Sequence, residues 1–99
     1  MLDFYLINDD QATPGSPEQL NLTFVGGLDS QTFENLVKKI VIDARFDYYS
    51  DFRWSSAIVQ ELRTKTVKLG HQGEADIQQL IRLLDSGLKQ NSGLIAFCD

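Results

Sequence analysis

Residues 43–54 contain the densest group of side chains suited to molecular recognition. The segment has the sequence Asp-Ala-Arg-Phe-Asp-Tyr-Tyr-Ser-Asp-Phe-Arg-Trp, and five of the ten aromatic residues of the chain fall within it. Tyrosine, tryptophan and arginine are enriched at binding hot spots because they combine a large contact area with a directional polar group. The segment therefore predicts a surface that binds a protein partner through Arg45, Phe46, Tyr48, Tyr49, Arg53 and Trp54.

The same composition also has a structural interpretation. In a small domain, aromatic side chains can hold the connection between two helices against the core, while aspartate and arginine pair with each other and with helix ends. Residue types alone do not separate a partner-binding surface from such an internal cluster. Both interpretations therefore stay open from the sequence.

Two groups of carboxylates form the alternative site. Asp43, Asp47 and Asp51 are spaced by four residues, which on a helix would align three oxygen ligands for a hard cation. Asp9 and Asp10 follow a predicted strand, at the kind of strand end where open α/β sheets bind ligands. The alternative function is therefore ligand or metal binding, or a small enzyme, through one of these groups. Because their neighbours favour turns, caps and ion pairs, we expect no metal site.

Recognisable catalytic motifs are absent from the sequence. His71 is the only histidine, and no nucleophile-elbow pattern supplies a serine for it to activate. Neither a GxGxxG nor a P-loop sequence is present to hold a nucleotide, and His71 with Cys98 is too small a set for zinc. We therefore predict no catalytic residue and no cofactor, and we favour a non-enzymatic domain.

The charge of the chain narrows the class of partner. Its formal net charge is −5, from 14 acidic and 9 basic residues, and the basic residues are scattered along the sequence. Nucleic acids and anionic membranes need a clustered basic surface, so we expect neither as a partner. A basic protein partner suits this charge. A homodimer that buries some of the aromatic side chains is the second arrangement we consider.

Cysteine usage and the first residues indicate a compartment. Cys98 is the only cysteine, so no disulfide can form within these 99 residues, and a reducing environment is favoured. The run from Met1 to Ile7 has no basic leader and contains Asp3, which is not the pattern of a signal peptide. No apolar run approaches the length of a membrane span. The sequence therefore predicts a cytoplasmic protein.

Short apolar runs predict the strands that must position these groups. Residues 2–7 and 22–25 are bounded by turn-forming residues and are expected to be strands. Residues 94–98 are apolar throughout, which is typical of a strand covered on both faces. This last strand is therefore expected to be central in the sheet, beside the first.

Hydrophobic spacing predicts three helices, at 30–41, 51–69 and 74–90. Asp29 and Ser30 supply N-caps for the first helix. At 99 residues with 42% hydrophobic content, the chain is expected to fold as a single globular domain over residues 1–99. The order of elements predicts an α/β fold in which three helices cover a small sheet of two to three strands, with α+β as the alternative because strand directions are not readable.

Overall fold

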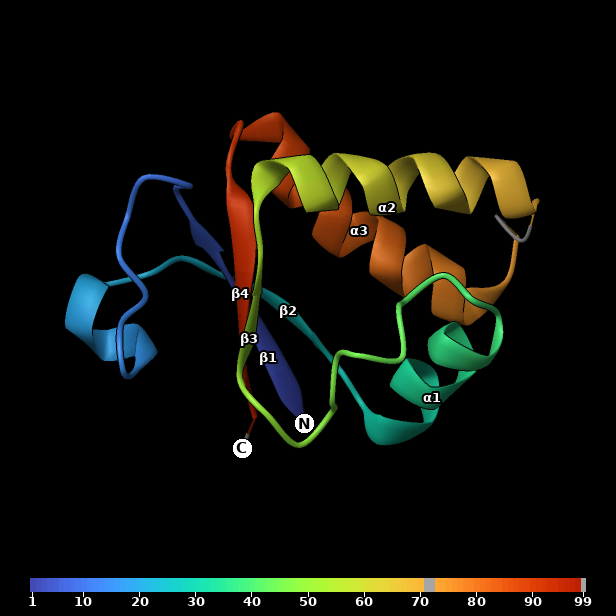
Figure 1. Cartoon of the computed structure of the whole chain (residues 1–99), viewed down its shortest axis with the longest axis horizontal. Coiled ribbons are helices and arrows are strands. Elements are labelled where there is room, and N and C mark those ends of the chain that lie inside the picture. The colour runs from blue at the N-terminus through green and yellow to red at the C-terminus, as the bar shows by residue number, and fades with distance from the viewer. Residues whose placement is uncertain (71–72, 99) are drawn as a thin grey trace.

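A four-stranded sheet with its three helices packed on one face forms the described part of the chain (Figure 1). The computed structural model describes residues 1–70 and 73–98. The elements in chain order are β1 (Leu2–Ile7), the 3-10 turn η1 (Pro17–Leu20), β2 (Phe24–Leu28), α1 (Ser30–Lys38), β3 (Phe52–Trp54), α2 (Ser56–Leu69), α3 (Ala75–Lys89) and β4 (Gly93–Cys98). We call the helix-covered side of the sheet the helix face and the opposite side the outer face.

The strand order is β2-β1-β4-β3, and every neighbouring pair is antiparallel. The prediction of a small sheet covered by three helices is confirmed. Its class is the α+β alternative, since no parallel pair is present among the described strands. The buried C-terminal strand β4 is central and pairs with β1 from Leu2 opposite Cys98 to Ile7 opposite Gly93, as its apolar sequence predicts.

The sequence did not predict strand β3. Its residues, 52–54, were expected to form the first turn of the helix at 51–69. Phe52 and Trp54 face the core while Arg53 lies on the outer face, and this alternation with period two is typical of a strand. Helix α2 begins later, at Ser56, where the Ser55 hydroxyl accepts a hydrogen bond from the Ile58 N–H at 3.3 Å. The prediction of two to three strands was therefore one short, because it counted β3 as helix.

Two other predicted boundaries differ from the structure. Helix α1 ends at Lys38 instead of residue 41, because Ile40 adopts a left-handed conformation with φ of 64°. The following Val41 N–H donates to the Leu36 carbonyl at 3.0 Å, and the turn directs Val41 into the core. Strand β2 runs from Phe24 to Leu28 instead of residues 22–25, with a bulge where its register to β1 shifts.

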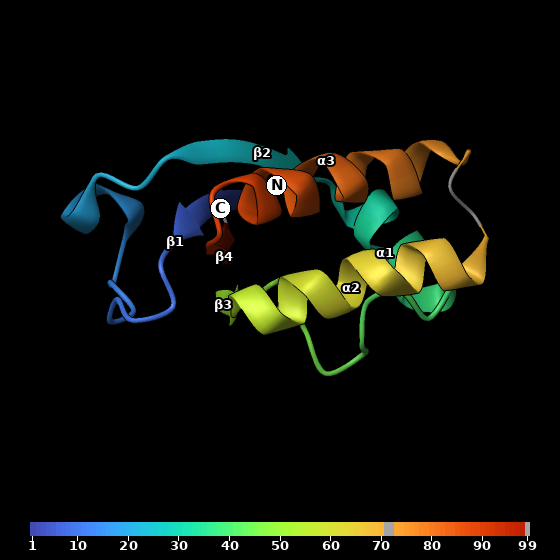
Figure 2. The same cartoon turned by 90° about the horizontal axis from the view of Figure 1, so that it is seen from above.

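The sheet carries hydrophobic side chains on both faces. The larger core lies on the helix face, where Phe4 and Trp54 are fully buried beneath the helices. A smaller cluster on the outer face joins Ile7, Ile95 and Phe97, with Leu22 packed against it. Figures 1 and 2 both place segment 8–23, with η1, on the outer-face side and the helices on the other. No helix within residues 1–70 and 73–98 is long and apolar enough to cross a membrane.

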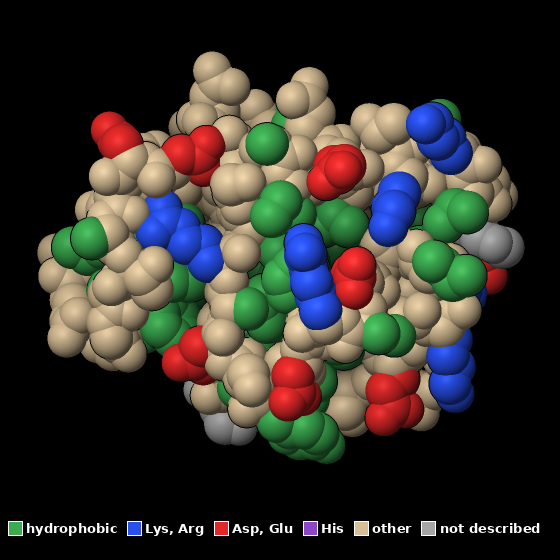
Figure 3. All heavy atoms as spheres, in the orientation of Figure 1, with side chains coloured by type: hydrophobic (Ala, Val, Ile, Leu, Met, Phe, Trp, Pro, Cys, Tyr) green, Lys and Arg blue, Asp and Glu red, His purple; other side chains and the backbone are tan. Residues whose placement is uncertain are grey.

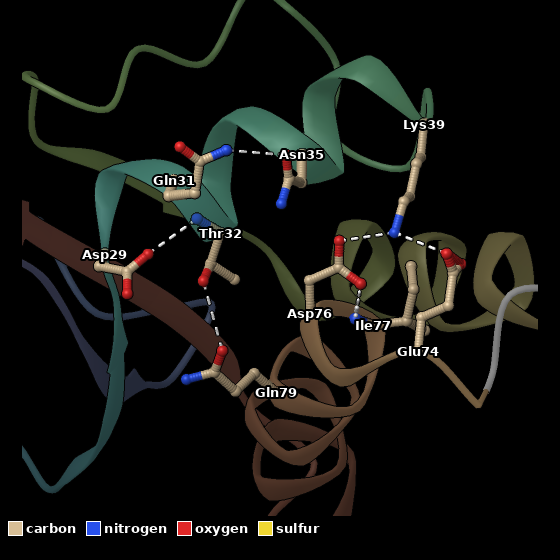
Figure 4. A network of polar contacts seen from close by, with 9 residues as sticks. All are labelled: Asp29, Gln31, Thr32, Asn35, Lys39, Glu74, Asp76, Ile77 and Gln79. Atoms are coloured by element: carbon tan, nitrogen blue, oxygen red, sulfur yellow. Dashed lines mark hydrogen bonds and ion pairs between the residues drawn. The ribbon is translucent and has the colours of Figure 1, made fainter.

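A charged bridge holds α1 against the beginning of α3 (Figure 4). Lys39 Nζ lies 2.6 Å from Asp76 Oδ2 and 2.9 Å from Glu74 Oε1. Near the start of α1, the Thr32 hydroxyl lies 3.5 Å from the Gln79 side-chain oxygen. Because α1 is only nine residues long, these contacts with α3 help set its position and that of the chain that follows it.

The left-handed conformation of Ile40 predicts that glycine at this position stabilises the fold. A β-branched residue in this region of φ is strained, and the Ile40 side chain is 72% exposed, so little burial offsets the strain. We expect Ile40→Gly to raise the free energy of unfolding by about 1 kcal/mol in urea titrations. Ile40→Ala, which keeps the Cβ atom, should gain less. Equal gains in both variants would show that strain is not the cause.

The Lys39 bridge predicts a pH-dependent contribution of Asp76 to stability. Burial raises the pKa of Asp76, but hydrogen bonds from Lys39 and the Ile77 N–H outweigh it and lower the pKa below the ordinary 3.8. The contribution is therefore complete above that ordinary value and is lost as pH falls through the lower folded-state value. We expect Asp76→Asn to unfold at a lower temperature than the parent at pH 7, and the difference to shrink as the pH falls below 3.8. A difference that stays constant as the pH is lowered through this range would contradict this assignment.

Lys39 provides the matched control for that experiment. Lys39→Met removes the same bridge from its other end, so its effect and that of Asp76→Asn should be less than additive in the double variant. Full additivity at pH 7 would show that the two side chains act independently.

Candidate functional site

The six residues predicted to bind a partner fall into two groups. Trp54 is fully buried, with its ring centroid 5.3 Å from that of Phe4 and 5.9 Å from that of Phe46. Its indole Nε1 makes no hydrogen bond with the described residues, so Trp54 contributes packing and not polar recognition. For Trp54, the structural interpretation of the segment therefore applies.

Arg53 also serves the fold. On the outer face its guanidinium donates to the Asn8 and Gln11 carbonyls, each at 2.6 Å, and to the Thr13 hydroxyl at 3.1 Å. Charge-assisted hydrogen bonds to carbonyls are among the stronger polar contacts in proteins. Arg53 thereby holds residues 8–13, the beginning of the segment on the outer face, against the sheet.

Asp9, one of the two carboxylates proposed to bind a ligand after β1, caps α2. Its Oδ1 accepts from the Ser56 N–H at 2.8 Å, and its Oδ2 accepts from the Ser56 hydroxyl. These hydrogen bonds from Ser56 lower the pKa of Asp9 below its ordinary value, and the charge of Arg53 adds to them. The adjacent Asp10 is exposed. Through Asp9, the turn after β1 therefore joins the sheet to α2.

The Asp43, Asp47 and Asp51 series is not on a helix, so the three carboxylates do not share the face that their spacing would create. Each accepts a backbone N–H instead, from Arg45 at 2.9 Å, Tyr49 at 3.0 Å and Cys98 at 2.9 Å respectively. In the part of the chain that the structure describes, no group of three or more potential metal-binding side chains is close enough to hold an ion. His71 lies outside the described residues.

The remaining four predicted residues lie on the α1–β3 connector, which we define as residues 39–51. Tyr49 is 75% exposed and its ring meets that of Tyr48 edge to face at 5.0 Å. Tyr48 is half-buried against Phe33 of α1, with ring centroids 5.7 Å apart. Burial, together with nearby negative groups that include Asp29, raises the pKa of the Tyr48 phenol. Tyr48 thus supports the position of the exposed Tyr49.

A groove runs between the connector and α1. It has a volume of about 480 Å³ and is lined by Phe33, Glu34, Val37 and Lys38 of α1 and by connector residues 44 and 46–49. We call it the connector groove. Its walls therefore include three of the predicted residues, Phe46, Tyr48 and Tyr49.

A second hollow lies on the other side of Phe46. It measures about 270 Å³ and is lined by Asp43, Arg45 and Phe46 together with α2 residues from Ile58 to Lys65. The Arg45 guanidinium lies over the Phe46 ring, 4.8 Å from its centroid, in a cation–π arrangement. The connector is therefore a ridge with a hollow on each side, and α2 alone lines a further shallow surface beyond it.

The surface around this ridge mixes apolar and acidic side chains. In Figure 3, hydrophobic side chains reach the lower margin over the lowest part of the connector, with acidic side chains beside them. Glu34 and Asp47 line the connector groove, and Lys38 is the only basic residue in its lining. The arrangement offers contact area, an excess of negative charge and phenolic hydroxyls.

Ile40 is an exposed connector residue that the sequence did not identify. It follows Lys38 and Lys39 at the end of α1 and is not part of the lining of the connector groove. Its exposure depends on where α1 ends, and hydrophobic spacing had extended that helix through residue 41. A lone isoleucine in a helical stripe carries no signal that distinguishes it from a core residue.

The comparisons with known proteins give no family for this chain. No protein-family model matches it, and neither a curated protein nor a solved structure shows a significant match. Its function therefore has to be inferred from its own side chains.

The contacts of Arg53 predict that its removal destabilises the whole domain and loosens residues 8–13 in particular. Arg53→Ala should lower the free energy of unfolding by about 2 kcal/mol, because the four hydrogen bonds that the charged guanidinium donates to residues 8–13 are lost. Amide hydrogen exchange in residues 8–13 should become faster. Arg45→Ala is the matched control, since Arg45 is exposed and should change stability by no more than about 0.5 kcal/mol. Unchanged exchange in residues 8–13 would contradict the role given to Arg53.

Proposed function

We propose that this chain is a small non-enzymatic interaction domain that binds a protein partner through the connector ridge. The observation that carries the proposal is the contrast along residues 39–54. Trp54 is inside the core, whereas Tyr49 is 75% and Ile40 72% exposed on the same connector. Large side chains that are left outside a small core beside a groove are typical of an interaction surface.

Energetics support a role for Ile40 in this surface. Glycine would suit its backbone conformation better, and its apolar side chain is in contact with water. The residue therefore lowers stability without a compensating contact inside the domain. Strain that the fold does not need is most often found where a residue serves binding.

Charge supports a basic partner. The chain carries a net charge of −5, and the lining of the connector groove contains two carboxylates and one lysine. A partner that brings arginine or lysine beside an apolar side chain would complement both the negative potential and the tyrosine rings. We place this interaction in the cytoplasm, where a lone cysteine stays reduced, and we assign no nucleic-acid or membrane partner.

The proposal predicts a selective loss of binding in Tyr49→Ala. The tagged protein is used to isolate a partner from the native cell extract, and the partner is then purified and titrated by calorimetry. Tyr49→Ala should weaken its binding at least tenfold, which corresponds to about 1.4 kcal/mol. Ile40→Gly should also weaken binding although it stabilises the domain.

Phe24→Ala is the matched control for this titration. Phe24 is an aromatic residue 57% exposed on β2, away from the connector, so this variant should bind a partner with a single site as the parent does. Equal binding by the parent and Tyr49→Ala, or an equal loss in Phe24→Ala, would refute the connector ridge as the binding surface.

A further inference from the structure

The two edges of the sheet are protected to different degrees. Edge strand β3 has only three residues and carries Arg53, and short, charged strands resist pairing with other chains. Edge strand β2 has five residues, Phe24–Leu28, with no charged residue and no proline. No described strand pairs with its outer edge. Figure 2 shows β2 along one margin of the molecule and the connector along the opposite margin.

Backbone groups of β2 point away from the sheet at two positions. The Leu6 N–H donates to the Thr23 carbonyl at 2.9 Å, so alternate residues of β1 bond toward β2. The backbone groups of Tyr5 and Asp3 are therefore directed toward β4 on the other side. The β2 residues opposite them, Phe24 and Gly27, form non-hydrogen-bonded pairs with β1. A bulge lies between Phe24 and Gly27. The backbone N–H and C=O groups of these two residues therefore both point away from β1, toward the free edge of the sheet.

Side chains along this edge are complementary to a second copy of the same strand. Phe24 is 57% exposed and lies on the outer face, where its ring meets that of Tyr5 edge to face at 5.5 Å. Gly27 lies on that same face without a side chain, and a Cβ placed there would lie 3.0 Å from the Leu2 carbonyl oxygen, 3.1 Å from Met1 Sδ and 3.2 Å from Asp3 Oδ1, so only a residue without a Cβ fits beside these atoms. In an antiparallel pair, Phe24 of one copy would lie opposite Gly27 of the other, and an aromatic ring over a cross-strand glycine is a favourable pair.

The other facing pair fits the same register. Val25 packs against the helix-face core, and a Cβ on Gly26 would point to Leu83 of α3 on that same side. Opposing Val25 of one copy with Gly26 of the other therefore keeps each side chain on its own face. A shift by one residue would put Phe24 on the wrong face of the joint sheet.

We infer that two copies of this chain associate through antiparallel pairing of their β2 strands, with Phe24 opposite Gly27 across a twofold axis. The pair forms one continuous eight-stranded sheet. Phe24 and Gly27 of each copy exchange both of their outward backbone hydrogen bonds with the other copy. Because β2 itself contains no charged residue, no two charged side chains of the paired strands lie opposite each other.

Charge and size set the strength of this dimer. Each copy carries a net charge of −5, so the copies repel at long range and the repulsion is screened by salt. One pair of five-residue strands buries less than the roughly 800 Å² per partner of a standard interface. The dimer is therefore weak, forms at high protein concentration and becomes tighter as salt is added.

Sedimentation velocity from micromolar to millimolar protein, in low and high salt, tests this inference. The parent should shift from monomer to dimer as its concentration rises, at lower concentration in high salt. Phe24→Glu, which places a second carboxylate beside Asp3 of the other copy, should stay monomeric. Tyr49→Glu, which adds the same charge on the connector, should dimerise like the parent. A dimer lost in Tyr49→Glu and kept in Phe24→Glu would overturn the inference and place self-association on the connector.

Amide hydrogen exchange of the parent tests the backbone contact without any substitution. The N–H groups of Phe24 and Gly27 should exchange more slowly at millimolar than at micromolar concentration, while those of β3 stay unchanged. A parent that remains monomeric at millimolar concentration in high salt, or that dimerises without protecting these two amides, would overturn the inference. Because Phe24 and Tyr49 are on separate surfaces, failure here leaves the connector proposal to its own titration.

Discussion

Pairing of the short strand β3 with β4 is the contact on which both faces of the molecule depend. Phe52 and Trp54 pack on Phe4 from the helix face, with ring centroids 6.0 and 5.3 Å away. Arg53, between them, is directed to the outer face and binds the carbonyls of the turn after β1. Three consecutive residues thereby connect the aromatic core, the edge of the sheet and the segment on its outer face.

This pairing explains two further features of the fold. Gly93 begins β4 opposite the end of β3, where a Cβ atom would clash with the Trp54 carbonyl oxygen, so the strands approach closely only with glycine there. The end of β3 also brings Ser56 to Asp9, whose carboxylate accepts hydrogen bonds at the N-terminus of α2. A carboxylate at a helix N-terminus stabilises the helix. The acidic turn and the arginine are thus parts of one structural junction.

Much of the fold could be predicted wherever hydrophobic residues recur with the spacing of one type of secondary structure. The stripes of α1 and α3, the apolar β4 and the N-cap at Asp29 all follow from local spacing, and they are present as expected. Strand β3 was not predicted because three residues are too few to establish a period, and Ile58 and Leu62 of α2 extended the helical pattern backward. The end of α1 was placed too late because Val41 fits the helical stripe although it reaches the core through a turn.

The candidate site illustrates the same limit. Residue types identified segment 43–54 as unusual, but they could not assign each ring to the core or to the surface. Trp54 and Tyr49 are five residues apart and have opposite environments, because one belongs to a strand and the other to the turn before it. Exposure depends on a tertiary contact, the pairing of β3 with β4, which links residues 40 positions apart and leaves no local pattern.

The two proposed surfaces have a geometric relation that would affect binding. The connector and the edge of β2 lie on opposite margins of the molecule, so a dimer formed through β2 would leave both connectors exposed (Figure 2). A partner with two basic sites would then meet two connectors at a fixed separation, and its second contact would form at a raised effective concentration. If each connector binds one basic site with moderate affinity, a weak dimer of this chain would bind partners that carry two such sites more tightly than partners that carry one. The sheet that holds each connector in place would in this way also set the distance between the two.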